Sequence, residues 1–133
     1  NGRIFVAGSN ADMEKLIDGS EKSVNHYGNN ELIVAFKDER PASFDKFAIL
    51  ITETSNFNIG EFEIFAGNES PTGSFRSLGK FTTQNLLLIQ KPYQEFSFPK
   101  ITAKYFKFKI LRSHGGSTWY PYGTELQLWG ELN

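Results

Sequence analysis

Short stretches in which apolar and polar residues alternate are the feature that most restricts the fold of this chain. The clearest is Tyr105–Leu111, where Phe106 and Phe108 face one way and lysines face the other. Glu31–Lys37 and Glu61–Ala66 show the same period of two. Aromatic residues make up 15% of the chain, and aromatic and β-branched residues favour strands. These patterns predict an all-β protein.

Clusters of Gly, Asn, Ser and Pro separate these stretches and predict about eight strands in antiparallel order. An antiparallel β-sandwich of jelly-roll type fits, because it hides most sheet edges. One amphipathic stretch, Ala11–Ile17, predicts a helix that ends in a turn at Asp18-Gly19. The predicted strands are Arg3–Ala7, Glu31–Lys37, Phe44–Thr52, Glu61–Ala66, Phe75–Thr82, Gln94–Phe98, Tyr105–Leu111 and Thr124–Glu131.

Length and charge narrow the classes of function. The 133 residues predict a single domain over residues 1–133. A net charge of −1 argues against a nucleic-acid-binding protein, which shows a basic excess.

The absence of cysteine excludes disulfides and Cys-based metal sites, and no apolar run reaches the length of a membrane span. Because the sequence begins at Asn1 without a signal peptide, we expect it to be part of a larger multidomain protein.

The sequence shows no catalytic motif. A glycosidase needs two carboxylates about 5–9.5 Å apart across a cleft, and apart from Asp18 and Glu125 no pair of acids stands at matched strand ends. The patterns G-x-S-x-G, G-x-G-x-x-G and H-E-x-x-H are also missing. We therefore expect a protein that is not an enzyme.

Function is expected on the loops, which a rigid sandwich holds in place. The loop Ser113–Gly123 carries three large aromatic residues, Trp119, Tyr120 and Tyr122. The C–H face of a sugar stacks on such rings, so this loop is a candidate sugar-binding site. The alternative is that one of these rings folds back over the core as a lid. His114 is read as a polar loop residue. The other long loops are His26–Asn30, Thr52–Gly60, Gly67–Gly73 and Thr83–Pro92.

Five segments, in this order along nearly the whole chain, resemble the discoidin, or coagulation factor 5/8 type C, family. Within it they are similar to the bacterial carbohydrate-binding modules of family 32. The resemblance implies a galactose-binding-domain-like jelly roll. The segments are Leu16–Ser23, Glu31–Ile51, Ile59–Gly67, Tyr93–Leu111 and Tyr122–Leu132.

The resemblance also implies a ligand site. His26 and Asn56 match polar ligand contacts of the sugar-binding members, and the aromatic loop matches their stacking ring. The family's tryptophan position, just before this histidine, holds Asn25. Its usual arginine is absent from the loop at Thr52–Asn58, where Glu53 or Thr52 stands nearest its place. The expected ligand-binding residues are His26, Glu53, Asn56, Trp119, Tyr120 and Tyr122. For His26 the alternative is a half-buried histidine bonded to the backbone.

A structural calcium ion is the cofactor that the resemblance implies. Asp18 and Glu125 would supply carboxylates, and Glu21 and Ser23 would add carbonyl or hydroxyl oxygens. Calcium prefers six to eight oxygen ligands, so the donor types suit it. The alternative is an Asx turn at Asp18 and a solvated Glu125.

Together these features predict a module that tethers a larger secreted enzyme or adhesin to a glycan. The expected place is outside the cell, at the cell surface or in the periplasm. Two alternatives stay open: a discoidin-type adhesion module for protein or phospholipid, and a module of an intracellular assembly. Animal discoidin domains usually join their ends by a disulfide, which this chain cannot form.

Overall fold

The computed structural model describes residues 2–7, 17–18, 22–27, 31–36, 40–51, 53–56, 58–70, 73–116 and 126–132, with side chains from residue 31 onward except those of Leu32, Val34 and Leu132. These residues form ten strands: β1 (Gly2–Ala7), β2 (Ile17–Asp18), β3 (Lys22–Tyr27), β4 (Glu31–Phe36), β5 (Ala42–Leu50), β6 (Ile59–Gly67), β7 (Phe75–Thr82), β8 (Tyr93–Ala103), β9 (Tyr105–Ser113) and β10 (Leu126–Leu132).

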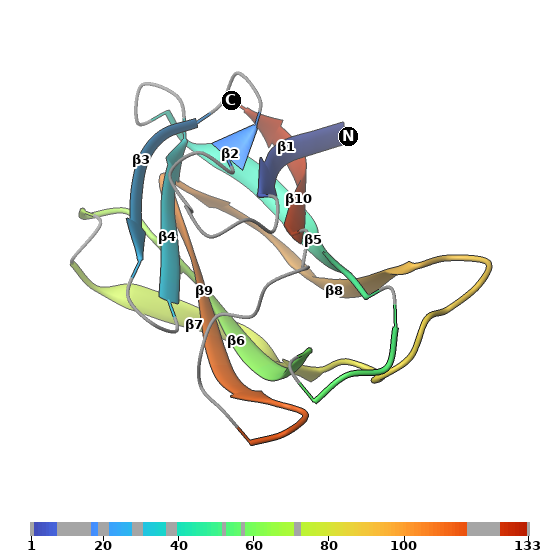
Figure 1. Cartoon of the computed structure of the whole chain (residues 1–133). Helices are drawn as coiled ribbons and strands as arrows, with labels where there is room; N and C mark the ends of the chain where they lie inside the picture. The colour runs from blue at the N-terminus through green and yellow to red at the C-terminus, as the bar shows by residue number, and fades with distance from the viewer. Residues whose placement is uncertain are drawn as a thin grey trace.

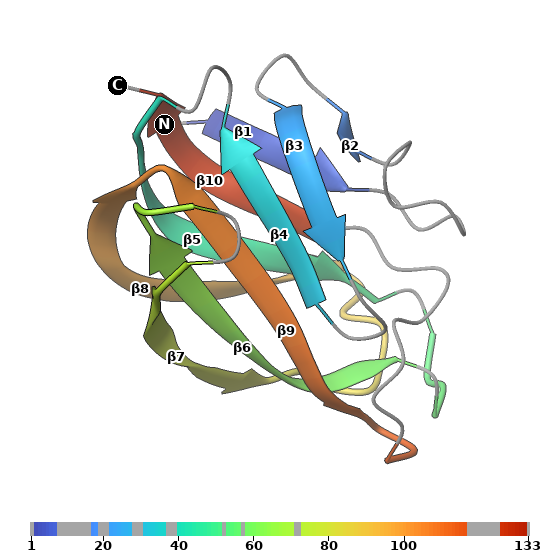
Figure 2. The ribbon, with the colours of Figure 1, turned by 90° about the vertical axis from the view of Figure 1, so that its left-hand side faces the viewer.

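The strands form two antiparallel sheets of five strands each, which pack face to face. One sheet has the order β2-β1-β10-β5-β8 and the other the order β3-β4-β9-β6-β7. Figure 1 shows the two layers from the side, and Figure 2 looks onto the second sheet. The last strand of the chain therefore lies between β1 and β5, in the middle of the first sheet. This architecture confirms the predicted antiparallel β-sandwich.

The core between the sheets is built largely of phenylalanine. Phe47 lies at its centre, with ring centroids 5.2 Å from Phe108, 5.5 Å from Phe106 and 5.6 Å from Phe62. Stacked and tilted ring contacts of this kind add to the free energy gained by burying apolar surface. The buried core phenylalanines are Phe36, Phe44, Phe47, Phe62, Phe98, Phe106 and Phe108.

Gly130 marks a close approach between two central strands. The register of β10 on β5 shifts between Trp129 and Gly130. A Cβ at Gly130 would overlap the carbonyl oxygen of Ser43 and lie 2.7 Å from the Phe44 Cα. Glycine is needed there because the backbone of β5 occupies the space of a side chain.

The predicted strands agree with the structure in position, with three differences. β8 is six residues longer than the predicted strand Gln94–Phe98, with one more residue at its start and five more at its end. The added part includes Pro99 and Lys100, which are tolerated because β8 is an edge strand. β2 and β3 were not predicted, since neither shows an apolar alternation. Residues 11–16 of the predicted helix lie outside the described residues, and Ile17 and Asp18 form β2 rather than a helix end and turn.

Candidate functional site

Several loops meet at one end of the sandwich. The segments 51–58, 83–92 and 113–116 all lie at the end where β5, β7 and β9 stop, in the lower part of Figure 2. β3 ends and β4 begins at the same end. The β6–β7 connection lies at the opposite end. The topology therefore separates Gly67–Gly73 from the other predicted loops.

The loop after β5 is held by two asparagine side chains. Asn58 Nδ2 donates to the Glu53 carbonyl at 2.7 Å and to Asn85 Oδ1 at 2.8 Å. The same Asn85 oxygen accepts the Ser55 N–H at 2.9 Å. These bonds join the β5–β6 loop to the β7–β8 loop. They hold the backbone of the loop in place around the predicted ligand residues Glu53 and Asn56.

The turn after β9 docks on the same loop. The His114 N–H donates to the Asn58 carbonyl at 2.9 Å, and the Gly115 N–H donates to the Asn56 carbonyl at 2.8 Å. A Cβ at Gly115 would lie 2.9 Å from the Asn56 Cβ. Gly116 has a φ of +94°, which glycine adopts without strain. The chain that leads to Trp119 therefore departs from a fixed point beside Asn56.

Thr83 and His114 form a buried link beneath these loops. The Thr83 hydroxyl donates to the Ile59 carbonyl, and His114 Nε2 lies 2.9 Å from the same hydroxyl. A hydroxyl has one proton to give, so it accepts from His114, which fixes the Nε2–H tautomer. Burial and the charge of Arg112 both lower the pKa of His114. The imidazole is therefore held neutral near pH 7.

The structure brings some of the predicted ligand residues together. Glu53 and Asn56 lie on the β5–β6 loop, and both are exposed. His26 lies within β3, not in a loop as predicted, and its backbone pairs with Ile33. Its strand ends at the loop end of the sandwich. Trp119, Tyr120 and Tyr122 lie outside the described residues.

His114, Asn58 and Asn85 are the structural residues of this end that sequence reasoning missed. His114 was read as a polar loop residue, but it connects three loops through Thr83 and Asn58. A short polar side chain in a loop is common, so nothing in the sequence pointed to these particular pairings. The only available signal was the density of Asn, Thr and Ser in the two loops.

Of the predicted calcium ligands, Asp18 lies on β2 of the first sheet and Ser23 lies on β3 of the second sheet. Asp18 of β2 pairs with Val6 of β1, and Val6 pairs on its other side with Gln127 of β10. Asp18 and Gln127 are therefore two strand spacings apart, about 9–10 Å.

The rest of the predicted metal set is not described. Glu21 and Glu125 lie outside the described residues, and for Asp18 and Ser23 the backbone alone is described. Within the described part of the chain, no three His, Asp or Glu side chains are grouped so as to hold a metal ion.

The described part also contains no helix that is long and apolar enough to cross a membrane.

Solved structures share this fold over nearly the whole chain. The module CBM32-3 of a family 31 glycoside hydrolase from Clostridium perfringens has a TM-score of 0.62 and 16% identity, covering 98% of this chain and 90% of that one. The C-terminal domain of a chitobiase from Bacteroides fragilis has a TM-score of 0.60 and 15% identity, covering 98% and 93%.

A third structure was solved with a ligand. CBM32-5 of Clostridium perfringens, in complex with GalNAc-β-1,3-galactose, has a TM-score of 0.58 and 15% identity, covering 93% of this chain and 91% of that one. No family model and no curated protein sequence matches the chain. The chain therefore has the discoidin-like fold of the family 32 modules, as the resemblance of its sequence segments predicted.

Proposed function

We propose that this chain is a non-catalytic carbohydrate-binding module. The observation that supports this most is the match of the entire fold to family 32 modules at nearly full coverage of both chains. One of these modules was solved with a GalNAc-β-1,3-galactose ligand. A weak, shallow site would suit such a module, since it must hold a parent protein on a glycan surface and release it.

The proposed site lies at the loop end of the sandwich. Glu53 and Asn56 are exposed on a loop whose backbone is fixed by hydrogen bonds. An exposed carboxylate accepts hydrogen bonds from sugar hydroxyls or from an acetamido N–H. The rings of Trp119, Tyr120 and Tyr122, from the segment that begins beside Asn56, would stack on the sugar, and His26 would add a hydrogen bond.

The test is direct binding of the whole chain to an array of glycans, with titration of GalNAc-β-1,3-galactose by calorimetry. Trp119→Ala and Glu53→Gln each weaken binding at least tenfold, about 1.4 kcal/mol or more, with unchanged thermal unfolding. Glu69→Gln, at the opposite end of the sandwich, is the matched control and leaves affinity unchanged. Absence of any glycan hit from a folded sample would overturn the proposal.

We also propose a structural calcium ion at the edge of the first sheet. Asp18, Glu21, Ser23 and Glu125 would supply its oxygens and join the segment after β1 to the start of β10. Binding to the native state alone raises stability by mass action, so added calcium raises the melting temperature. Glu125→Ala removes that rise, whereas an unfolding curve that EDTA does not shift contradicts the ion.

The proposed setting is a larger secreted or cell-surface bacterial protein, in which the module tethers a neighbouring domain to its glycan. A second function, discoidin-type adhesion to protein or phospholipid, is favoured by one feature. Leu86, Leu87 and Ile89 stand exposed on the β7–β8 loop, and Ile89 is 88% exposed. Clustered exposed apolar side chains mark interaction surfaces. Binding to lipid vesicles without any glycan binding would favour this second function.

A further inference from the structure

The two halves of β8 differ in how they are protected from pairing with another chain. β8 is the outermost strand of its sheet. Its second half contains Pro99 and Lys100, and its pairing with β5 is irregular between Phe44 and Lys46. Proline, lysine and bulges are the features by which proteins block an exposed strand edge. The first half, Tyr93–Ser97, has none of them and pairs regularly with β5.

The backbone of this first half offers hydrogen-bonding groups to solvent. The Ile51 N–H donates to the Pro92 carbonyl at 3.4 Å, so residues 92, 94 and 96 direct their backbone groups toward β5. The backbone groups of Tyr93, Glu95 and Ser97 therefore point to the open edge. Among the described residues, no strand pairs with that edge. Three consecutive donor–acceptor pairs are thus available along it.

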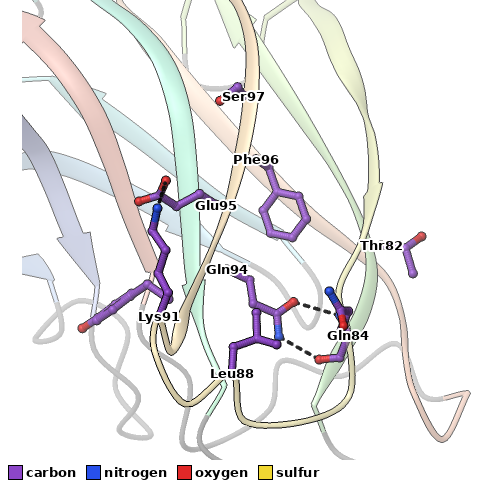
Figure 3. Close-up of a pocket in the computed structure, with 9 residues that line it drawn as sticks. Thr82, Gln84, Leu88, Lys91, Gln94, Glu95, Phe96 and Ser97 are labelled. Atoms are coloured by element: carbon purple, nitrogen blue, oxygen red, sulfur yellow. Dashed lines mark hydrogen bonds and ion pairs between the residues drawn. The ribbon is translucent and has the colours of Figure 1, made fainter.

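A groove runs along the same edge. It has a volume of about 400 Å³, and both the inward-facing and the outward-facing residues of Tyr93–Ser97 line it. Its other wall comes from Thr82 at the end of β7 and from the β7–β8 loop, including Leu88. In Figure 3 the ring of Phe96 points from β8 toward Thr82. Because residues of both faces line it, the groove follows the edge of the strand.

The groove has a rigid floor. The Phe96 ring packs edge-on against Phe62 at 5.0 Å and against Phe81 at 5.6 Å. One side of the ring is therefore fixed by the core, while the residue as a whole remains partly exposed. A side chain that enters the groove would meet a preformed apolar surface, which lowers the entropy cost of binding.

Gln94 fixes the wall of the groove. It is 6% exposed, and its Oε1 accepts the Gln84 N–H at 2.8 Å, while its Nε2 donates to the Gln84 carbonyl at 2.8 Å. Figure 3 shows this reciprocal pair as dashed lines. The side-chain amide of Gln94 therefore exchanges two hydrogen bonds with the backbone of Gln84, as a residue of a neighbouring strand would. Both of its polar atoms are engaged, so it is not available to bind a sugar hydroxyl.

An apolar surface adjoins the end of the groove. Leu86 and Leu87 are each 42% exposed and Ile89 is 88% exposed, all on the loop that leads into β8. At the strand itself, Glu95 lies 3.0 Å from Lys91 Nζ and 3.4 Å from Lys46 Nζ. The surface therefore combines an open strand edge, an apolar loop tip and a charged cluster with one more lysine than carboxylate.

We propose that the free edge of β8 at Tyr93–Ser97 binds an extended segment of a partner protein by β-strand addition. The segment carries an apolar side chain over Phe96 and Leu88 and an aspartate or glutamate beside Lys91. Main-chain hydrogen bonds give affinity in this mode, and the pocket for alternate side chains gives specificity.

The features of the edge favour such a segment over other occupants. A second copy of this chain, paired antiparallel through all three open residues, would place the cluster of Lys46, Glu95 and Lys91 opposite itself, and its surplus positive charges would repel each other. A glycan is disfavoured because the planar amide of Gln94 is already bonded to Gln84. An extended peptide with an acidic residue pairs with the backbone groups and with the surplus positive charge of Lys46 and Lys91.

The test uses amide hydrogen exchange of the whole chain, measured by NMR. The probe is a capped heptapeptide of alternating valine and threonine with a central glutamate. At a peptide concentration about ten times its dissociation constant, exchange at Glu95 and Ser97 slows about tenfold. The amides of Gln94 and Phe96 change little, because they already bond to β5. Equal protection of all four amides, or none at saturating peptide, would overturn the proposal.

Two controls keep the outcome clear. Ser97→Pro removes an N–H that points to the open edge, so it costs no bond to β5 and abolishes peptide binding. The same peptide with N-methylated backbone amides does not protect the wild-type chain, which tests the proposal even if the proline variant fails to fold. Protection by GalNAc-β-1,3-galactose, by a second copy of the chain at high concentration, or by phosphatidylserine vesicles in place of the peptide would contradict it.

Discussion

The interior of the sandwich and its loop end are held together by different physical means. In the interior, Phe47 and its neighbours pack ring against ring, and apolar burial supplies the free energy. At the loop end, Asn58, Asn85 and His114 join three loops by directed hydrogen bonds. Packing tolerates changes in detail as long as volume is kept, whereas a hydrogen-bonded loop depends on the position of each polar atom.

This difference suits a binding module. The core can fix the two sheets without involving the ligand. The loops can then vary their exposed residues, such as Glu53 and Asn56, while residues beneath them keep the backbone in place. Four substitutions or conditions test whether the two regions are separable in this way.

The largest effect is expected in the core. Phe47→Ala removes contacts to three other rings and leaves a cavity, so the free energy of unfolding falls by about 3–5 kcal/mol. Urea unfolding followed by circular dichroism measures it. The control is Phe65→Ala on the outer face, where the ring mainly contacts Lys107 at 4.4 Å and the loss is about 1 kcal/mol. Similar losses for both variants would contradict the assignment of the core.

The next effect is expected at the link beneath the loops. Thr83→Val keeps the shape of the side chain but leaves the Ile59 carbonyl and His114 Nε2 without their partner, at a cost of about 1–3 kcal/mol. Thr82→Val is the matched control, because Thr82 is exposed on the preceding position and the change stays within about 0.5 kcal/mol. If the two variants unfold at the same urea concentration, the buried link does not stabilise the loop end.

A smaller effect is expected from pH. The pKa of His114 is lowered below 6.5 in the folded chain, so the unfolded chain binds the proton more readily. His114 therefore costs the folded chain no stability above about pH 6.5, and the free energy of unfolding decreases as the pH falls toward the folded pKa. Thermal unfolding between pH 7.5 and 5.5 measures the slope. His114→Gln flattens it, and an unchanged slope in this variant would assign the effect to another group.

The smallest effect is expected at the surface ion pairs. Glu95→Gln removes the pairing with Lys46 and Lys91, whose charges hold the pKa of Glu95 below its usual value. Because the pairs are partly exposed, the free energy of unfolding falls by less than about 1 kcal/mol, and less still in high salt. A loss as large as that of Thr83→Val would show that this carboxylate supports more than two surface pairs.

Local sequence predicted the parts of the molecule that depend on apolar pattern. Phe75–Thr82 coincides with β7, and the alternation in Tyr105–Leu111 identified β9. β3 was missed because Lys22–Tyr27 is mostly polar and is held by pairing with β4 instead of by its own pattern. Pairing between distant segments is a tertiary effect that no short window contains.

The site was predicted less completely, for the same reason. Glu53 and Asn56 were identified from a family resemblance, and the structure places them on one exposed loop. The joining of Asn58 to Asn85 and to His114 spans 27 and 56 positions along the chain and follows from topology alone. Sequence spacing does not reveal which of many polar loop residues will meet.

The most direct test of the central claim is an NMR titration of the labelled chain with GalNAc-β-1,3-galactose. If the loop end binds glycan, the amides of residues 53–58 and 113–116 shift together with a single affinity. The amides of residues 68–74, at the far end of the sandwich, stay unchanged. Shifts confined to residues 68–74 would contradict the account. The absence of any shift, with the disaccharide and with every glycan that the array identifies, would contradict it as well.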